Sequence, residues 1–206
     1  LYMQDWDTAI EYASILIDDK KNTFKLADAK TKYNADYTFF DYMWAYDLSY
    51  EIIWRIGFTE TSYGSPLGTV FLNFTKDLTY YYPDYVPATA ALNLYDAADL
   101  RYSGYFAGKE QGLTIGYTNG LDWPMLVKYY GNRNFTSKLI FHVSMPKPFR
   151  LAEQYLIRAE AYCRKNDFTK AGNDLTALRK MRYASGGTLN LSLIHISEPT
   201  RHLRIS

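Results

Sequence analysis

Two amphipathic segments separated by a short polar break constrain the fold of this chain more than any other feature. They lie between Pro148 and Tyr183, on either side of 165–167. Apolar residues recur at the spacing of one helix face in each segment: Leu151, Tyr155, Ala159 and Tyr162, then Phe168, Ala171, Leu175 and Leu178. This periodicity predicts two helices. Because the break is so short, we expect them to form an antiparallel hairpin.

The beginning of the chain repeats part of this pattern. Residues 1–18 read as a helix with Asp5 as its N-cap and with Trp6, Ile10, Ala13 and Ile17 on one face. The orders Asp5-Trp6-Asp7-Thr8-Ala9 and Asp167-Phe168-Thr169-Lys170-Ala171 match as acid, aromatic, two further residues and alanine. This spacing is typical of tetratricopeptide-type turns, where the aromatic packs between helices and the alanine permits close approach.

Between these ends the pattern is irregular. Residues 51–56 read as a strand, 59–68 as a loop, 26–32 as a short helix, and 88–98 as a helix begun at Pro87. The rest of the middle reads as hairpins and loops, with Asn119-Gly120 as a turn signal. Trp6, Trp44 and Trp54 are assigned to the core. The expected fold is mainly α, with tetratricopeptide-like helix pairs, long irregular loops and minor β-hairpins.

Charge, hydropathy and motifs exclude several functional classes. The formal net charge is +1, from 23 basic and 22 acidic residues, which offers no electrostatic footprint for nucleic acid. No apolar run approaches the roughly 18 residues needed to span a bilayer. The sequence carries no nucleophile elbow, phosphate-binding loop or metal-ligand spacing, so we expect no catalytic residue, metal or cofactor. His142 is interpreted as structural.

Aromatic residues make up 17% of the chain and include 21 tyrosines. Tyrosine offers an apolar face and a polar rim, which suits both carbohydrate and peptide surfaces. Sugar recognition requires such faces beside planar polar groups on loops of a rigid scaffold, and the loops between Thr79 and Tyr130 fit that description. The candidate stacking residues are Tyr81, Tyr82, Tyr85 and Trp123, with Asp84, Asn119 and Asp122 as hydroxyl partners. Packing against the scaffold is the alternative for each.

Paired carboxylates for glycoside hydrolysis need only lie about 5–10 Å apart in space, so sequence alone leaves that reaction open. The candidates are Asp84, Asp96, Asp99 and Asp122. We expect them to cap helices or lie solvated in loops, and we expect Asp99 and Arg101 to form a structural pair.

The C-terminal motifs resemble those of the SusD/RagB family. The residues concerned are PFRLAEQYLIRAEAY at 148–162, DFTKA at 167–171 and LTALR at 175–179. Weaker matches lie upstream in the same order: DWDTAIEYASILI at 5–17, EIIWRI at 51–56 and LYDAADLRYSGYF at 94–106. The resemblance extends to about Tyr183.

The resemblance implies a non-catalytic glycan-binding lipoprotein on the outer leaflet of the outer membrane, facing the extracellular side. Such a protein binds an oligosaccharide and delivers it to a SusC-like TonB-dependent transporter. It also implies a mainly helical scaffold, with 1–147 as the central region carrying the glycan-face loops and 148–191 as the start of the C-terminal helical region. Because Leu1-Tyr2-Met3 reads as the end of a helix, we expect the native N-terminus, with its lipid anchor, to lie outside this sequence.

Residues 192–206 are expected to be a non-native tail. Ser192 to Arg201 resembles the one-frame translation of a transposase-type sequencing adapter, and residues after it fit an index followed by fixed sequence. Two alternatives to glycan uptake stay open: a tetratricopeptide-type scaffold that binds protein partners, and a fragment of a glycoside hydrolase.

Overall fold

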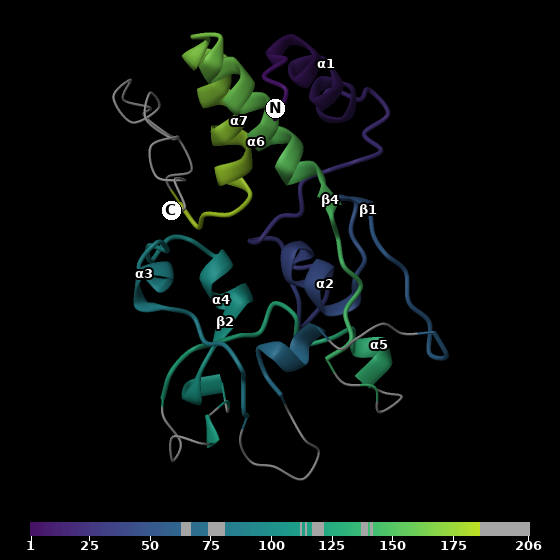
Figure 1. Cartoon of the computed structure of the whole chain (residues 1–206), viewed down its shortest axis with the longest axis vertical. Helices are drawn as coiled ribbons and strands as arrows, with labels where there is room; N and C mark the ends of the chain where they lie inside the picture. The colour runs from purple at the N-terminus through teal and green to yellow at the C-terminus, as the bar shows by residue number, and fades with distance from the viewer. Residues whose placement is uncertain are drawn as a thin grey trace.

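The computed structural model describes residues 1–62, 67–73, 81–111, 113, 115–116, 122–136, 140 and 142–185. The expectations for Asn119-Gly120 and for the tail at 192–206 lie outside these residues. Figure 1 shows a layer of long helices at one end of the molecule and shorter elements joined by loops at the other.

The helical layer consists of α1 (Trp6–Ile17), α6 (Leu151–Arg164) and α7 (Phe168–Lys180). Helix α6 packs against both of the others (Figure 1). Small side chains allow the close approach, since Ala13, Ala159, Ala161 and Ala171 are each 2% exposed or less. These are the helices that the periodicity predicts, and the hairpin of α6 and α7 is confirmed.

The matched helix starts have the same cap. Asp5 accepts a hydrogen bond from the Thr8 amide at 3.1 Å, and Asp167 accepts one from the Lys170 amide at 3.1 Å. Each carboxylate satisfies an amide that the first helical turn would otherwise leave unpaired. The repeat seen in the sequence therefore marks two equivalent helix beginnings. Assignment of the helices to tetratricopeptide-like pairs stays a prediction.

One arginine joins all three helices. Arg158 on α6 is 8% exposed and donates from Nε and Nη2 to both oxygens of Asp174 on α7, at 2.8 and 2.7 Å. Its Nη1 donates to Ser14 and Asp18, at 3.0 and 2.7 Å, at the end of α1. The planar guanidinium suits such forked pairing, and its partners satisfy the charge that burial would otherwise penalise.

The other end of the molecule contains short elements. The helices are α2 (Phe39–Tyr46), α3 (Thr89–Leu92), α4 (Arg101–Tyr105) and α5 (Arg133–Thr136), with 3₁₀ turns η1 (Leu67–Val70) and η2 (Lys109–Gln111). Strand β1 (Ile52–Trp54) pairs antiparallel with β4 (Phe149–Arg150), and β2 (Phe106–Ala107) pairs antiparallel with β3 (Met125–Leu126). The described structure is thus mainly helical with two small sheets.

Two apolar clusters hold these elements. The first surrounds α2 and contains Phe40, Met43 and Trp44 with Ala27 and Ala29. The second contains Leu72, Tyr81, Ile115 and Met125. Tyr129 packs on the first cluster and Tyr130 on the second, so the segment after β3 connects them.

A buried glutamate joins the helical layer to the rest. Glu51 is fully buried, and its Oε2 accepts hydrogen bonds from the Ala27 amide at 2.8 Å and from Arg182 at 2.6 Å. Its Oε1 accepts one from Arg150 at 3.1 Å, and its carbonyl accepts one from the Leu151 amide at 2.8 Å. Segments near residues 27, 51, 150 and 182 therefore meet at one carboxylate.

Several predicted elements differ from the structure. Residues 26–32 form bends and an isolated bridge rather than a helix, and the helix expected over 88–98 covers only Thr89–Leu92.

Trp44 is a core residue as predicted, at 7% exposed, and Trp6 is half-buried. The assignment of Trp54 to the core is wrong, because the residue is 52% exposed. Its ring packs on Phe149 across the β1–β4 pair, with ring centres 5.8 Å apart.

Within the described ranges, no helix combines the length and the apolar character that crossing a bilayer requires.

Candidate functional site

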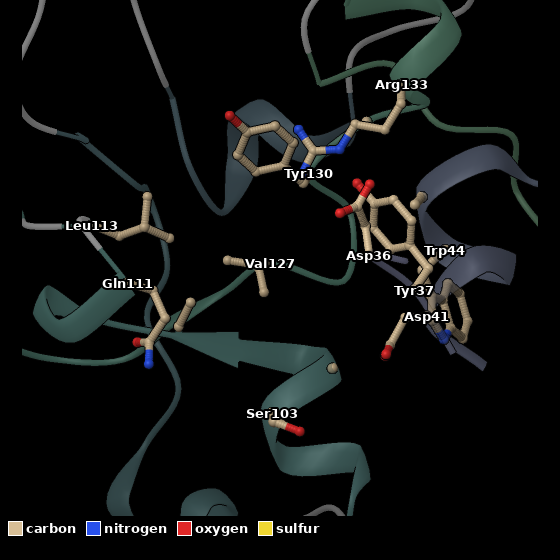
Figure 2. A pocket seen from close by; sticks show the side chains of 14 residues that line it. Asp36, Tyr37, Asp41, Trp44, Ser103, Gln111, Leu113, Val127, Tyr130 and Arg133 are labelled. Atoms are coloured by element: carbon tan, nitrogen blue, oxygen red, sulfur yellow. The ribbon is translucent and has the colours of Figure 1, made fainter. Parts of the chain in front are cut away.

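A recess of about 420 Å³ opens where α2, α4, the β2–β3 pair and α5 meet. Figure 2 shows Asp36, Tyr37, Asp41 and Trp44 on one side, Gln111 and Leu113 opposite, and Tyr130, Arg133 and Ser103 completing the rim. We call this the α2–α4 recess. The residues that line it are Asp36, Tyr37, Asp41, Trp44, Ala45, Ser103, Gly104, Ala107, Gln111, Leu113, Val127, Tyr130, Gly131 and Arg133.

Tyr37 and Tyr130 supply aromatic surface from opposite parts of the chain. A tight turn positions Tyr37: its carbonyl accepts from the Tyr33 amide at 2.8 Å, and its amide donates to the Asn34 side chain at 2.8 Å. The guanidinium carbon of Arg133 lies 4.0 Å from the centre of the Tyr130 ring, which is the geometry of a cation–π contact. Figure 2 shows this stacked pair at the edge of the recess.

Buried residues fix Tyr130 from behind. The Nδ1 of His142 lies 2.8 Å from the Tyr130 carbonyl, and its ring packs edge-on against the tyrosine ring. His142 is 1% exposed, which supports its structural interpretation, and burial lowers the pKa of its imidazole. A hydrogen bond also joins the hydroxyls of Tyr81 and Tyr130, and burial raises the pKa of Tyr81. Tyr130 is thus a rigidly held ring.

Polar groups surround the aromatic surface. Asp41 in the first turn of α2 accepts from the Thr38 hydroxyl at 2.7 Å, while the Thr38 oxygen accepts from the Asp41 amide at 3.1 Å. Helix α4 approaches this carboxylate closely, because a Cβ at Gly104 would lie 2.8 Å from Asp41 Oδ1. The Gln111 side-chain oxygen accepts from the Gly108 amide at 2.8 Å, which directs the amide group of Gln111.

Three cations surround the indole of Trp44. Lys128, Lys147 and Arg150 lie 4.3, 5.1 and 5.2 Å from its ring. Lys147 pairs with Asp47 and Arg150 pairs with Glu51, whereas Lys128 forms no ion pair with any described residue. Lys128 instead contacts the rings of Trp44, Tyr105 and Tyr129. Burial, and then the neighbouring Arg150 and Lys147, lowers the pKa of Lys128 to about 8.

We expect Lys128→Met to raise the free energy of unfolding at pH 7 by about 1–3 kcal/mol, because the variant no longer buries an unpaired ammonium group. The gain in stability stays moderate because the variant also loses three cation–π contacts of the ammonium group. Between pH 8 and 10.5 the unfolded chain holds the Lys128 proton and the folded protein releases it, so wild-type stability rises relative to the variant. Urea unfolding of both proteins at several pH values measures the difference. A stability gap that stays constant from pH 7 to 10 would contradict the assignment.

The structure does not gather the sequence-predicted binding residues into one pocket. Tyr81 is 6% exposed inside the second apolar cluster, so burial keeps its ring from stacking on a ligand. Tyr82 is half-buried against Gly116. The indole of Trp123 is half-buried and donates to the Pro87 carbonyl at 3.0 Å. Packing against the scaffold therefore describes Tyr81, while ligand contact at Tyr82 and Trp123 stays a prediction.

The remaining candidates lie at the surface. Tyr85 is 67% exposed, and Asp84 is exposed beside it. Asp122 is exposed, accepts from the Lys109 amide at 3.2 Å, and lines a second pocket next to the recess. Asn119 lies outside the described residues. As expected, Asp99 pairs with Arg101, whose Nε lies 2.8 Å from Asp99 Oδ1.

Sequence reasoning did not find Tyr37, Asp41, Gln111, Tyr130 and Arg133 as members of one site. These residues are separated along the chain and form no short motif. One local signal was present: Thr38 followed three residues later by Asp41 is typical of a helix start, and it would have placed α2 and the turn before it.

A larger groove of about 750 Å³ lies on the outer side of α2. Its lining is dominated by apolar and aromatic side chains, including Tyr33, Phe39, Tyr42 and Tyr50. The α2–α4 recess combines rings with carboxylate, amide, hydroxyl and guanidinium groups, and it is therefore the better candidate for a polyhydroxylated ligand. Among the described residues, no group of three or more histidine, cysteine, aspartate or glutamate side chains is arranged to hold a metal ion.

Comparison with known proteins gives matches at the level of structure. No family model and no curated protein sequence matches the chain. Solved structures do match, among them a SusD-like carbohydrate-binding protein from Bacteroides vulgatus (TM-score 0.66, 21% identity), a SusD superfamily protein from Bacteroides thetaiotaomicron (0.65, 17%) and surface glycan-binding protein A from Bacteroides uniformis (0.61, 15%).

The alignments cover 95, 89 and 93% of this chain but only 37, 39 and 40% of the respective solved chains. The chain therefore spans about two fifths of the length of these structures. Over nearly all of its own length, this chain has the fold of SusD-like proteins.

Proposed function

We propose that the α2–α4 recess binds a glycan without hydrolysing it. The observation that most supports this proposal is the composition of the recess. Aromatic surface from Tyr37 and from the Tyr130–Arg133 pair faces polar side chains on the rim, which are Asp36, Asp41, Ser103 and Gln111. Aromatic faces suit the apolar side of a sugar ring, and the planar polar groups suit its hydroxyls. The similar folds of proteins described as glycan-binding or carbohydrate-binding support this proposal.

We also propose the wider role that the sequence resemblance implies: a lipid-anchored protein on the outer face of the outer membrane that delivers its glycan to a SusC-like TonB-dependent transporter. This role concerns the whole protein. Co-purification of the full-length protein with a SusC-like transporter of the same organism would test the partnership.

A carboxylate pair for glycoside hydrolysis gains no support at Asp99. Burial would raise the pKa of this carboxyl, but the hydrogen bonds and charge of Arg101 outweigh that effect and the pKa lies below its ordinary value. A general acid in a glycosidase needs the opposite shift. The pKa of Asp99 therefore does not suit a general acid, and the proposal of binding without turnover rests on the composition of the recess.

We expect Tyr37→Ala to weaken binding of a recognised polysaccharide about tenfold, because the variant removes one aromatic wall of the recess, an effect of about 1.4 kcal/mol. Affinity gel electrophoresis against a panel of soluble polysaccharides measures the retardation, and a reducing-sugar assay on the same mixtures measures turnover. The matched control is Tyr12→Ala, which removes a tyrosine that is 64% exposed on α1, away from the recess.

The variant Tyr85→Ala tests whether the glycan binds instead to the tyrosine-rich loop that the sequence predicts as the site. Loss of retardation in Tyr85→Ala with Tyr37→Ala unchanged would place the glycan on the 82–87 segment instead. Release of reducing sugar would contradict the non-catalytic role.

A further inference from the structure

The α2–α4 recess continues along α4 into two further pockets. A pocket of about 490 Å³ shares Ser103, Ala107 and Gln111 with the recess. A third, of about 320 Å³, shares Tyr102 and Ser103 with the second. Because Ser103 lines all of them, the pockets adjoin around one side chain. We call this connected surface the α4 groove. A bound oligosaccharide that extends beyond the recess would pass along it.

Among the residues that the structure describes, carboxylates outnumber cations along the α4 groove. The lining carboxylates are Asp36, Asp41, Asp96, Asp99, Glu110 and Asp122, and the lining cations are Lys109 and Arg133. Arg101 outside the lining neutralises Asp99. The remaining groove residues still carry a net negative charge.

The cations nearest to the groove, other than those that line it, do not reverse the negative net charge of its lining. Lys147 and Arg150 are paired with Asp47 and Glu51 behind Trp44. Lys128 is enclosed by the rings of Trp44, Tyr105 and Tyr129 and does not line the groove. Among the described lining residues, a ligand in the groove therefore meets exposed carboxylates such as Asp36, Glu110 and Asp122, and the two cations already named.

We infer that the α4 groove selects uncharged glycans and rejects glycans that carry uronate or sulfate groups. The inference rests on the proposed glycan-binding function and specifies its substrate class. An acidic sugar would bring its charge into a lining where carboxylates exceed the two cations Lys109 and Arg133, whereas a neutral sugar carries no charge to be repelled. The discrimination should be strongest at low ionic strength, because salt screens charges that are exposed.

The test compares matched polysaccharides that differ only in charge. Affinity gel electrophoresis would use methyl-esterified against de-esterified galacturonan, xylan with and without glucuronate branches, and galactan with and without sulfate, at low salt. We expect retardation by at least one neutral member and little by its acidic counterpart. The variant E110Q/D122N, which changes carboxylates of the second pocket and none of the recess, should strengthen binding of that acidic counterpart about fourfold, from roughly twofold per charge removed, and leave neutral binding within about twofold.

The control variant E11Q/E153Q removes the same number of charges from exposed positions on α1 and α6. It should leave both affinities unchanged. Asn at position 122 can still accept the hydrogen bond from the Lys109 amide, so the groove variant keeps that contact.

The outcomes are distinguishable. Retention of acidic members equal to or tighter than their neutral counterparts would overturn the charge selection and leave glycan binding intact. An equal gain in the control variant would also overturn it, because the effect would then come from net charge alone. Failure of every polysaccharide in the panel to retard the protein would count against the proposed function and against this inference together.

Discussion

Glu51→Ala should lower the free energy of unfolding by about 3–5 kcal/mol. The substitution leaves Arg182, which is 4% exposed, buried without its carboxylate partner, and it also removes the acceptor for the Ala27 amide. An unpaired buried charge and an unpaired buried amide each destabilise a folded state. Because Glu51 joins four segments of the chain, we expect the helical layer and the α2 region to lose stability together.

Urea unfolding followed by tryptophan fluorescence measures the effect, since Trp44 lies in the cluster next to this network and Trp6 in the helical layer. The matched control is Glu153→Ala, which changes an exposed glutamate on α6 and should shift stability by no more than about 0.5 kcal/mol. Glu51→Gln should fall between the two, because it keeps hydrogen-bond acceptors but loses the charge. A Glu51→Ala variant as stable as Glu153→Ala would show that the network does not hold the two parts together.

Arg158→Met should lower the free energy of unfolding by a similar amount, about 3–5 kcal/mol. Methionine retains much of the apolar stem volume, so the loss reports the charged group rather than a large cavity. The variant leaves Asp174, which is 5% exposed, without the two hydrogen bonds from α6, and it releases α1 from its contacts at Ser14 and Asp18. We therefore expect α1 to separate from α6 first.

The double variant Arg158→Met/Asp174→Leu tests whether the unpaired carboxylate causes the loss. Replacing both partners by apolar residues should recover at least half of the stability lost by the single variant. Hydrogen exchange of the α1 amides would show whether that helix is released. The role given to this arginine would be contradicted if the free energy of unfolding of the single variant lay within about 1 kcal/mol of the wild-type value. A double variant less stable than the single one would also contradict it.

The helical layer could be predicted because its signals are local. Periodic apolar positions and two acidic caps define α1, α6 and α7, and these features depend only on residues within one or two helical turns. Helix α2 was missed for a local reason too. Its sequence FFDYMWAY is aromatic on several sides, so no single apolar face stands out, although Phe40, Met43 and Trp44 point inward.

The position of Trp54 could not be predicted from its neighbours. The β-branched and aromatic run correctly indicates a strand, but the face that it buries depends on its partner. That partner, β4, is two residues long and pairs with an irregular register, which leaves Trp54 and Phe149 beside each other at the surface.

The candidate site was only partly accessible to sequence reasoning. The sequence predicts stacking rings around Tyr81–Tyr85 because aromatic and polar residues on loops suit sugar recognition, but tertiary packing buries Tyr81, where it supports Tyr130. The recess is formed instead by residues from α2, α4, η2, α5 and the segments beside them. These elements approach one another through contacts such as that between Gly104 and the Asp41 carboxylate. No pattern within a short window reports such contacts.

The assignment of a glycan site to the α2–α4 recess is the claim on which the functional account rests. A crystal structure of the protein with a bound neutral oligosaccharide, chosen from the retarding polysaccharides, tests it most directly. We expect an intact, uncleaved sugar chain with one ring against Tyr37 or Tyr130 and with its hydroxyls bonded to Asp41 or Gln111. An oligosaccharide bound on the outer side of α2 or on the 82–87 segment, with the recess empty, would contradict the account.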